Sequence, residues 1–95
     1  MKMNHSIIKD YEVASKILQE QPERYTRDEI VGFITDVPTI RPEAVTHLTQ
    51  MIDYTYDGYP ADKHFRTTSI LPTFSLLIQR AKDRRAYEIF PHSNA

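Results

Sequence analysis

Glycine is scarce in this sequence, and its scarcity limits the folds open to it. The 95 residues include only two glycines, Gly32 and Gly58, and six prolines. Tight β-hairpins need residues such as glycine or asparagine at positive φ between alternating apolar residues. The one such dipeptide, Asp57-Gly58, follows an apolar pattern of helical period instead. We therefore predict a helical chain in which proline and glycine mark most of the helix ends.

Apolar residues recur at spacings of three and four in four segments, as expected where one face of a helix is buried. These segments comprise residues 6–21, 25–37, 41–58 and 70–90. They predict an all-α fold, a compact bundle of about four helices, formed by one small domain over residues 1–95 with a frayed tail at 91–95. Residues 86–90 alternate in polarity, which leaves a short C-terminal extended segment as an alternative.

Two helix starts and one helix end carry specific signals. Thr26 and Glu29 have the spacing of a capping box, in which each side chain accepts a hydrogen bond from the backbone N–H of the other residue. Pro42 suits a first helical turn, because its missing N–H would have no partner there. Gly58 suits the position just after that helix, where φ is positive.

Composition and charge exclude several classes of protein. The formal net charge is −1, so nothing global attracts the chain to nucleic acid or to an anionic membrane. The absence of cysteine excludes disulfides, zinc–thiolate sites and thiol nucleophiles. The N-terminal residues lack the apolar region of a signal peptide, and no apolar run approaches the roughly 18 residues of a membrane span. We expect a cytoplasmic protein that does not enter membranes.

Motifs for catalysis and metal binding are also missing. The stretch from Asp53 follows the pattern of an EF-hand loop as far as Gly58, but His64 occupies the position of the bidentate glutamate. The four histidines lie in separate segments, and no pair has the i, i+4 spacing of a zinc site. Two glycines cannot build a phosphate-binding loop. We therefore expect neither an enzyme nor a cofactor or metal site.

The helix predicted over residues 41–58 has a second face that carries His47, Met51 and Tyr54 at spacings of four and three. Tyr54 lies about 200° around the helix from the core-facing Ile52, at 100° per residue. In one interpretation the helix touches neighbours on two sides, so that Tyr54 is partly core. In the other, the three residues form an exposed patch that docks a partner, since tyrosine and methionine are enriched in interfaces.

The main positive cluster lies in the last predicted helix, where Arg84 and Arg85 replace the apolar residues expected to follow Ala81. Either these arginines are a solvated helix end favoured by the helix dipole, or they anchor an acidic partner, a phosphate, or the acidic half of a second copy of the chain in a dimer. Arginine suits the second role because its guanidinium group pairs carboxylates and phosphates through two hydrogen bonds. The candidate partner-binding residues are thus His47, Met51, Tyr54, Arg80, Arg84 and Arg85.

These patterns predict a non-enzymatic regulator, inhibitor or adaptor that binds a macromolecule, with a protein as the expected partner. The alternative is a helix-turn-helix DNA-binding transcription regulator, whose outline fits residues 25–54. The recognition helix of that alternative, residues 42–57, would carry Glu43, Asp53 and Asp57 but no lysine or arginine. Because these acids would repel DNA phosphates, nucleic acid is disfavoured as a partner. The sequence leaves open whether the protein forms a homodimer.

Overall fold

The fold consists of helices and one small antiparallel sheet, seen in a computed structural model that describes the backbone of residues 3–89 and the side chains of residues 7–84. The predicted all-α bundle of about four helices is confirmed. In chain order the elements are α1 (Met3–Gln19), β1 (Arg24–Thr26), α2 (Arg27–Thr35), α3 (Pro42–Thr55), β2 (His64–Arg66), the 3₁₀ helix η1 (Thr67–Ile70) and α4 (Leu71–Ile89).

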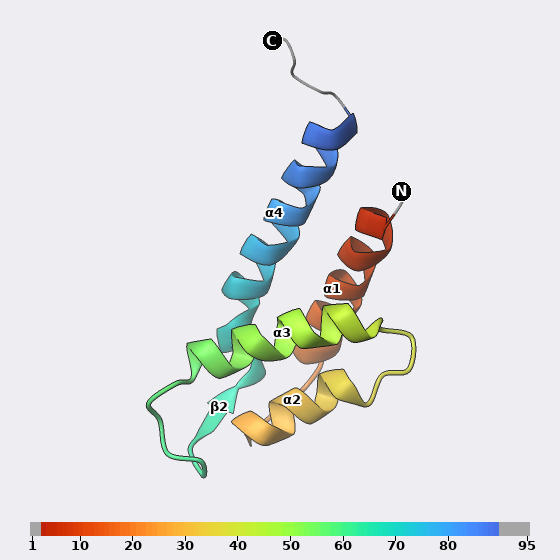
Figure 1. Cartoon of the computed structure of the whole chain (residues 1–95). Coiled ribbons are helices and arrows are strands. Elements are labelled where there is room, and N and C mark those ends of the chain that lie inside the picture. Colours follow the sequence, from red (N-terminus) through yellow and green to blue (C-terminus); the bar gives the residue numbers. More distant parts are fainter. Residues whose placement is uncertain (1–2, 90–95) are drawn as a thin grey trace.

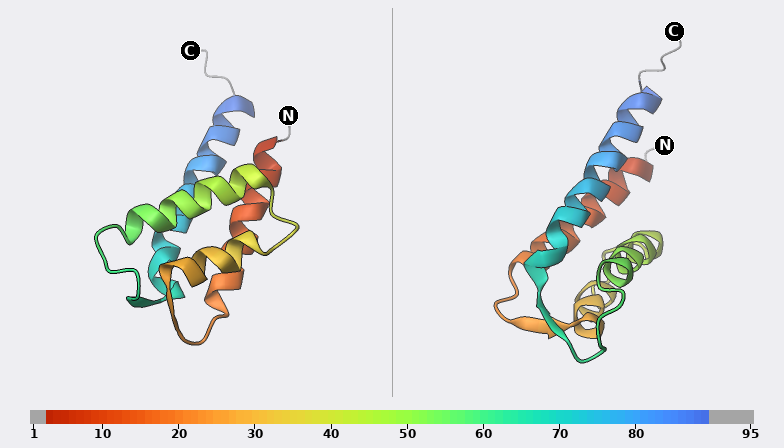
Figure 2. Two further views of the ribbon diagram at one scale, coloured as in Figure 1. Left: turned by 60° about the horizontal axis from the view of Figure 1, so that its bottom comes forward. Right: turned by 90° about the vertical axis from the view of Figure 1, so that its left-hand side faces the viewer.

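The helices form two layers (Figure 1). Helices α1 and α4 run side by side in opposite directions, and α2 packs with α3 in front of them. Seen from the side, the α2–α3 pair covers only part of the length of α4, whose C-terminal turns extend beyond it (Figure 2). Helix α3 thus contacts α4 as well as α2.

The two layers meet in one hydrophobic core to which all four helices contribute. Burial of this apolar surface is the main force that holds the layers together. On α3 the buried side chains are Ala44, Leu48 and Ile52, whereas Val45 is only half-buried. The buried cluster comprises Tyr11, Ala14, Leu18, Ile30, Ile34, Ile40, Ala44, Leu48, Ile52, Tyr56, Ile70 and Phe74.

The start of α2 is capped in the way its sequence predicts. The Oγ1 of Thr26 accepts a hydrogen bond from the N–H of Glu29 at 3.2 Å, and the Oε1 of Glu29 accepts one from the N–H of Thr26 at 2.9 Å. Two backbone donors that have no partner within the helix are satisfied reciprocally. The predicted capping box is confirmed, and it explains why α2 begins directly after β1.

Replacing Thr26 with alanine should lower the free energy of unfolding by about 1 kcal/mol, because the Glu29 N–H loses its acceptor. Thr26→Ser keeps the hydroxyl group and serves as the matched control. Urea denaturation of the two variants and the wild-type protein measures the difference. Equal stability of Thr26→Ala and the wild type would show that this hydroxyl does not stabilise the helix start.

A short sheet joins the start of α2 to the start of α4. Strands β1 and β2 are antiparallel, with Tyr25 opposite Phe65. The Tyr25 ring meets Phe33 edge-on at a centroid distance of 4.9 Å, and Phe65 stacks on Tyr56 at 3.9 Å. These aromatic contacts stabilise a strand pair that would be marginal alone. The predicted helical segments leave residues 59–69 as a connection, so the sheet is an addition to the predicted fold.

Two predicted boundaries differ from those observed. Helix α3 ends at Thr55, and Gly58 adopts its positive φ of 90° in the turn that follows, from Tyr56 to Tyr59. The alternative of a C-terminal extended segment is wrong for residues 86–89, which continue α4. Continuous helical hydrogen bonding overrides the local alternation of polar and apolar residues there. Phe90 and the predicted frayed tail at 91–95 lie outside the described residues.

Candidate functional site

A groove runs between α3 and α4. It consists of two adjoining hollows, of about 840 and 290 Å³, which share Met51, Leu77 and Arg80 in their walls. We call the two hollows together the α3–α4 groove. Its principal side chains are His47, Met51 and Tyr54 from α3 and Leu76, Leu77, Arg80 and Arg84 from α4.

The groove brings together five of the six residues that the sequence marks as candidates for partner binding. His47, Met51 and Tyr54 line it from α3, and Arg80 and Arg84 line it from α4. Arg85 belongs to α4, but its side chain lies outside the described residues. The sequence identifies both groups separately, whereas their meeting depends on the packing of α3 beside α4.

Tyr54 is the most exposed large hydrophobic side chain of the described residues, with 81% of its surface accessible. The interpretation of Tyr54 as partly core is therefore wrong. The core side of α3 is filled by Ala44, Leu48 and Ile52, and Tyr54 lies about 200° around the helix from Ile52. The ring leaves apolar surface in water, and a partner that covers it would recover free energy.

Leu76 is a groove residue that sequence reasoning missed. It is 60% exposed, and it precedes Arg80 and Arg84 by one and two helical turns, so the three share one face of α4. A signal for it was present in the sequence. Leu76 follows the buried Phe74 by two residues, as Tyr54 follows Ile52, so both lie far from the core-facing stripe of their helices.

The arginines of the groove have no acidic partner among residues 7–84. Of the three ion pairs there, one joins Lys82 of α4 to Glu12 of α1 at 3.6 Å, and none involves Arg80 or Arg84. Both arginines are exposed. As far as residues 7–84 are concerned, their guanidinium groups are available to pair with carboxylates brought by another molecule.

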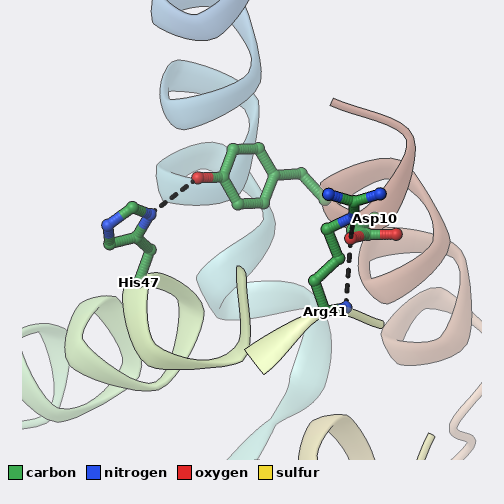
Figure 3. A network of polar contacts seen from close by, with 4 residues as sticks. Asp10, Arg41 and His47 are labelled. Carbon is green, nitrogen blue, oxygen red and sulfur yellow. Dashed lines mark hydrogen bonds and ion pairs between the residues drawn. The ribbon is translucent and has the colours of Figure 1, made fainter. Parts of the chain in front are cut away.

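Polar contacts hold α3 against α1 at the His47 end of the groove (Figure 3). The hydroxyl oxygen of Tyr11 lies 2.9 Å from Nδ1 of His47. The Asp10 carboxylate accepts a hydrogen bond from the Arg41 backbone N–H at 3.1 Å and lies 3.6 Å from Arg41 Nε. Asp10 is buried, and a buried carboxylate is tolerated when it is paired and hydrogen-bonded in this way. These contacts fix the position of α3, which forms one wall of the groove.

Stability should fall in strongly alkaline solution. Burial raises the pKa of the Tyr11 hydroxyl above its ordinary value of 10.0, with Arg84 opposing the shift. Burial raises the pKa of Tyr56 as well, with the hydrogen bond to Ser69 opposing the shift. The unfolded chain loses these protons near the ordinary value while the folded protein keeps them. The stabilisation is therefore full below about pH 10 and is lost as the pH rises further.

We expect the urea midpoint to decrease as the pH rises above about 10, and to decrease less in Tyr11→Phe, which cannot lose a proton at this position. Urea titrations of both proteins at several pH values measure how steeply each urea midpoint decreases with pH. If the two midpoints decreased equally, the Tyr11 hydroxyl would not contribute to the alkaline loss of stability.

The groove offers binding chemistry rather than the parts of a metal centre. Among the described residues, no three histidine, aspartate or glutamate side chains gather closely enough to hold a metal ion. No helix of the described chain is long and apolar enough to cross a membrane. The groove combines exposed apolar side chains with two cations, which suits an apolar segment that also carries acidic residues.

Comparison with known proteins does not assign the chain to a family. No protein-family model, no curated protein and no solved structure matches it.

Proposed function

We propose that the protein is a non-enzymatic regulator, inhibitor or adaptor that holds a segment of another protein in the α3–α4 groove. One observation carries this proposal: an exposed tyrosine, an exposed leucine and two arginines from two helices line the same groove. Interface energy concentrates in residues such as tyrosine and arginine. Neighbouring exposed apolar side chains are also typical of interaction sites.

The groove best fits an amphipathic helix that has acidic residues along one side. Such a helix inserts its apolar face into a hydrophobic groove, and Met51 and Leu77 offer apolar surface in both parts of this one. Arg80 and Arg84 are one helical turn apart, roughly 6 Å along the axis. This spacing matches two carboxylates one turn apart on a bound helix. Asp57, at the other end of the groove, would favour the positive N-terminus of that helix.

Affinity purification from cells that contain the protein, with quantitative mass spectrometry, tests the proposal. Leu76→Asp places a carboxylate in the groove and should remove the partner that the wild type captures, because the new charge repels an acidic segment and replaces apolar surface. Ser75→Asp adds the same charge to the neighbouring exposed position of α4 and is the matched control. Equal capture by the wild type and by Leu76→Asp would contradict binding in the groove.

DNA binding through α2 and α3, in the manner of a helix-turn-helix, remains the alternative function. These helices pack together and are joined by residues 36–41. However, Glu43 and Asp53 are exposed on α3, and the exposed Asp57 follows it, so acids would face DNA phosphates. This charge distribution favours a protein as the groove partner. A second copy of the chain in that role would make the purified protein dimeric in sedimentation experiments.

A further inference from the structure

The β1–β2 sheet carries like charges directly opposite each other. Arg24 of β1 is the register partner of Arg66 of β2. Opposite residues of an antiparallel pair project to the same face, as do residues two apart on one strand. Arg24, Arg66 and His64 therefore share one face of the sheet, and all three are exposed. Tyr25 and Phe65 project to the other face, where they contact the aromatic residues of the fold.

This placement of two arginines lowers the stability of the sheet unless an anion lies between them, because like charges opposite each other repel. None of the three ion pairs among residues 7–84 involves Arg24 or Arg66. Glu23 and Asp62 are near them in sequence and exposed, yet neither forms an ion pair there. Both guanidinium groups can therefore bind an anion that comes from outside the described residues.

A cleft of about 410 Å³ opens beside these strands and combines cations, hydroxyl groups and aromatic rings in its walls. Tyr59 is 51% exposed, and its ring is held edge-on against Phe65 at a centroid distance of 5.2 Å. No carboxylate of the described residues lines this cleft. The residues that can meet a ligand there are Arg24, Tyr59, Lys63, His64, Arg66 and Thr68.

We propose that this cleft binds a single-stranded nucleic acid, with Arg24, Lys63 and Arg66 contacting phosphates and the Tyr59 ring stacking on a base. Cations that follow the backbone beside an exposed aromatic ring are the combination used for single strands. An acidic protein would match the cations but would leave the ring without a specific role. A duplex keeps its bases stacked on one another, so it offers the ring no free base.

The net charge of −1 does not argue against nucleic-acid binding at this cleft, because charge is unevenly distributed along the chain. Residues 62–95 hold six lysines and arginines against three acids, and residues 1–61 hold six against ten. Two of the three cations of the site, Lys63 and Arg66, belong to the positive part. The site shares no lining residue with the α3–α4 groove, so the two proposals can fail independently.

Fluorescence anisotropy with a labelled oligothymidine of about 15 nucleotides tests the site. Arg24→Gln/Arg66→Gln should weaken binding about tenfold or more. It should also lower the slope of log affinity against log salt by about 1.4, since each lost phosphate contact on a single strand accounts for about 0.7. Tyr59→Leu should weaken binding about tenfold, whereas Tyr59→Phe keeps the ring and should bind like the wild type. Circular dichroism of each variant verifies that it is folded.

The matched control for the arginine variant is Lys9→Gln/Lys16→Gln, which removes the same charge from exposed positions of α1. It should leave the affinity unchanged. The proposal is overturned if the wild type does not bind the oligonucleotide, or if this control weakens binding as much as the arginine variant does. It is also overturned if duplex DNA or polyglutamate competes as well as the unlabelled single strand.

Discussion

Replacing Phe74 with alanine should lower the free energy of unfolding by about 3–5 kcal/mol. Phe74 is fully buried in the cluster to which all four helices contribute. Alanine would remove the contacts of the ring and leave a cavity that the surrounding helices can close only in part. Since a domain of this size has a total stability of about 5–15 kcal/mol, the expected loss is a large part of the whole.

The matched control for this substitution is Leu76→Ala, two residues along the same helix. Because Leu76 is 60% exposed, its truncation should change the stability by only about 0.5 kcal/mol or less. Urea denaturation of both variants measures the contrast. If Phe74→Ala were as stable as Leu76→Ala, the face of α4 that carries Phe74 could not be the one packed into the core.

Tyr54→Ala and Arg84→Ala should each weaken the binding of the proposed protein partner by about tenfold or more, with little change in melting temperature. Tyr54 is 81% exposed, so its removal leaves no cavity in the core. Arg84 forms no ion pair among the described residues, so its loss breaks none in that part of the chain. Arg84→Ala should also make binding less sensitive to salt, because it removes a charge contact that ions screen.

Titration calorimetry against the purified partner, at low and at moderate salt, measures the affinity and its salt dependence. Tyr54→Phe keeps the ring and Lys9→Ala removes a cation from an exposed position of α1, so both should bind like the wild type. A lower melting temperature of Tyr54→Ala with unchanged affinity would instead assign the tyrosine a role in stability.

The helices and half of the site could be predicted from the sequence because both depend on local spacing. Apolar periodicity located the four helices, and the spacing of Thr26 and Glu29 located the start of α2. The same periodicity marked Tyr54 as lying off the core stripe of α3 but left open whether it was partly core or exposed, and the structure shows it exposed. It also marked the arginines that interrupt the stripe of α4.

The remaining features depend on contacts between residues far apart in the chain. Strands β1 and β2 have three residues each, too few for an alternating pattern, and the stacking of Phe65 on Tyr56 helps to stabilise them. The Asp10–Arg41 hydrogen bond joins residues separated by 31 positions. The position of Asp10 among the apolar residues of α1 indicates that its carboxylate is buried and needs a hydrogen-bond donor. Only the packing of α1 against the start of α3 identifies that donor as Arg41.

Photo-cross-linking from position 54 is the measurement that tests the groove most directly. Replacing Tyr54 with p-benzoylphenylalanine keeps an aromatic side chain there, and irradiation of intact cells joins it to a molecule in contact. The same amino acid at Glu20, an exposed position after α1, reports on a surface outside the groove. Binding in the α3–α4 groove predicts a protein cross-linked from position 54, absent from position 20 and lost when Leu76→Asp is added. A product that survives Leu76→Asp, or that forms from position 20 alone, would contradict it.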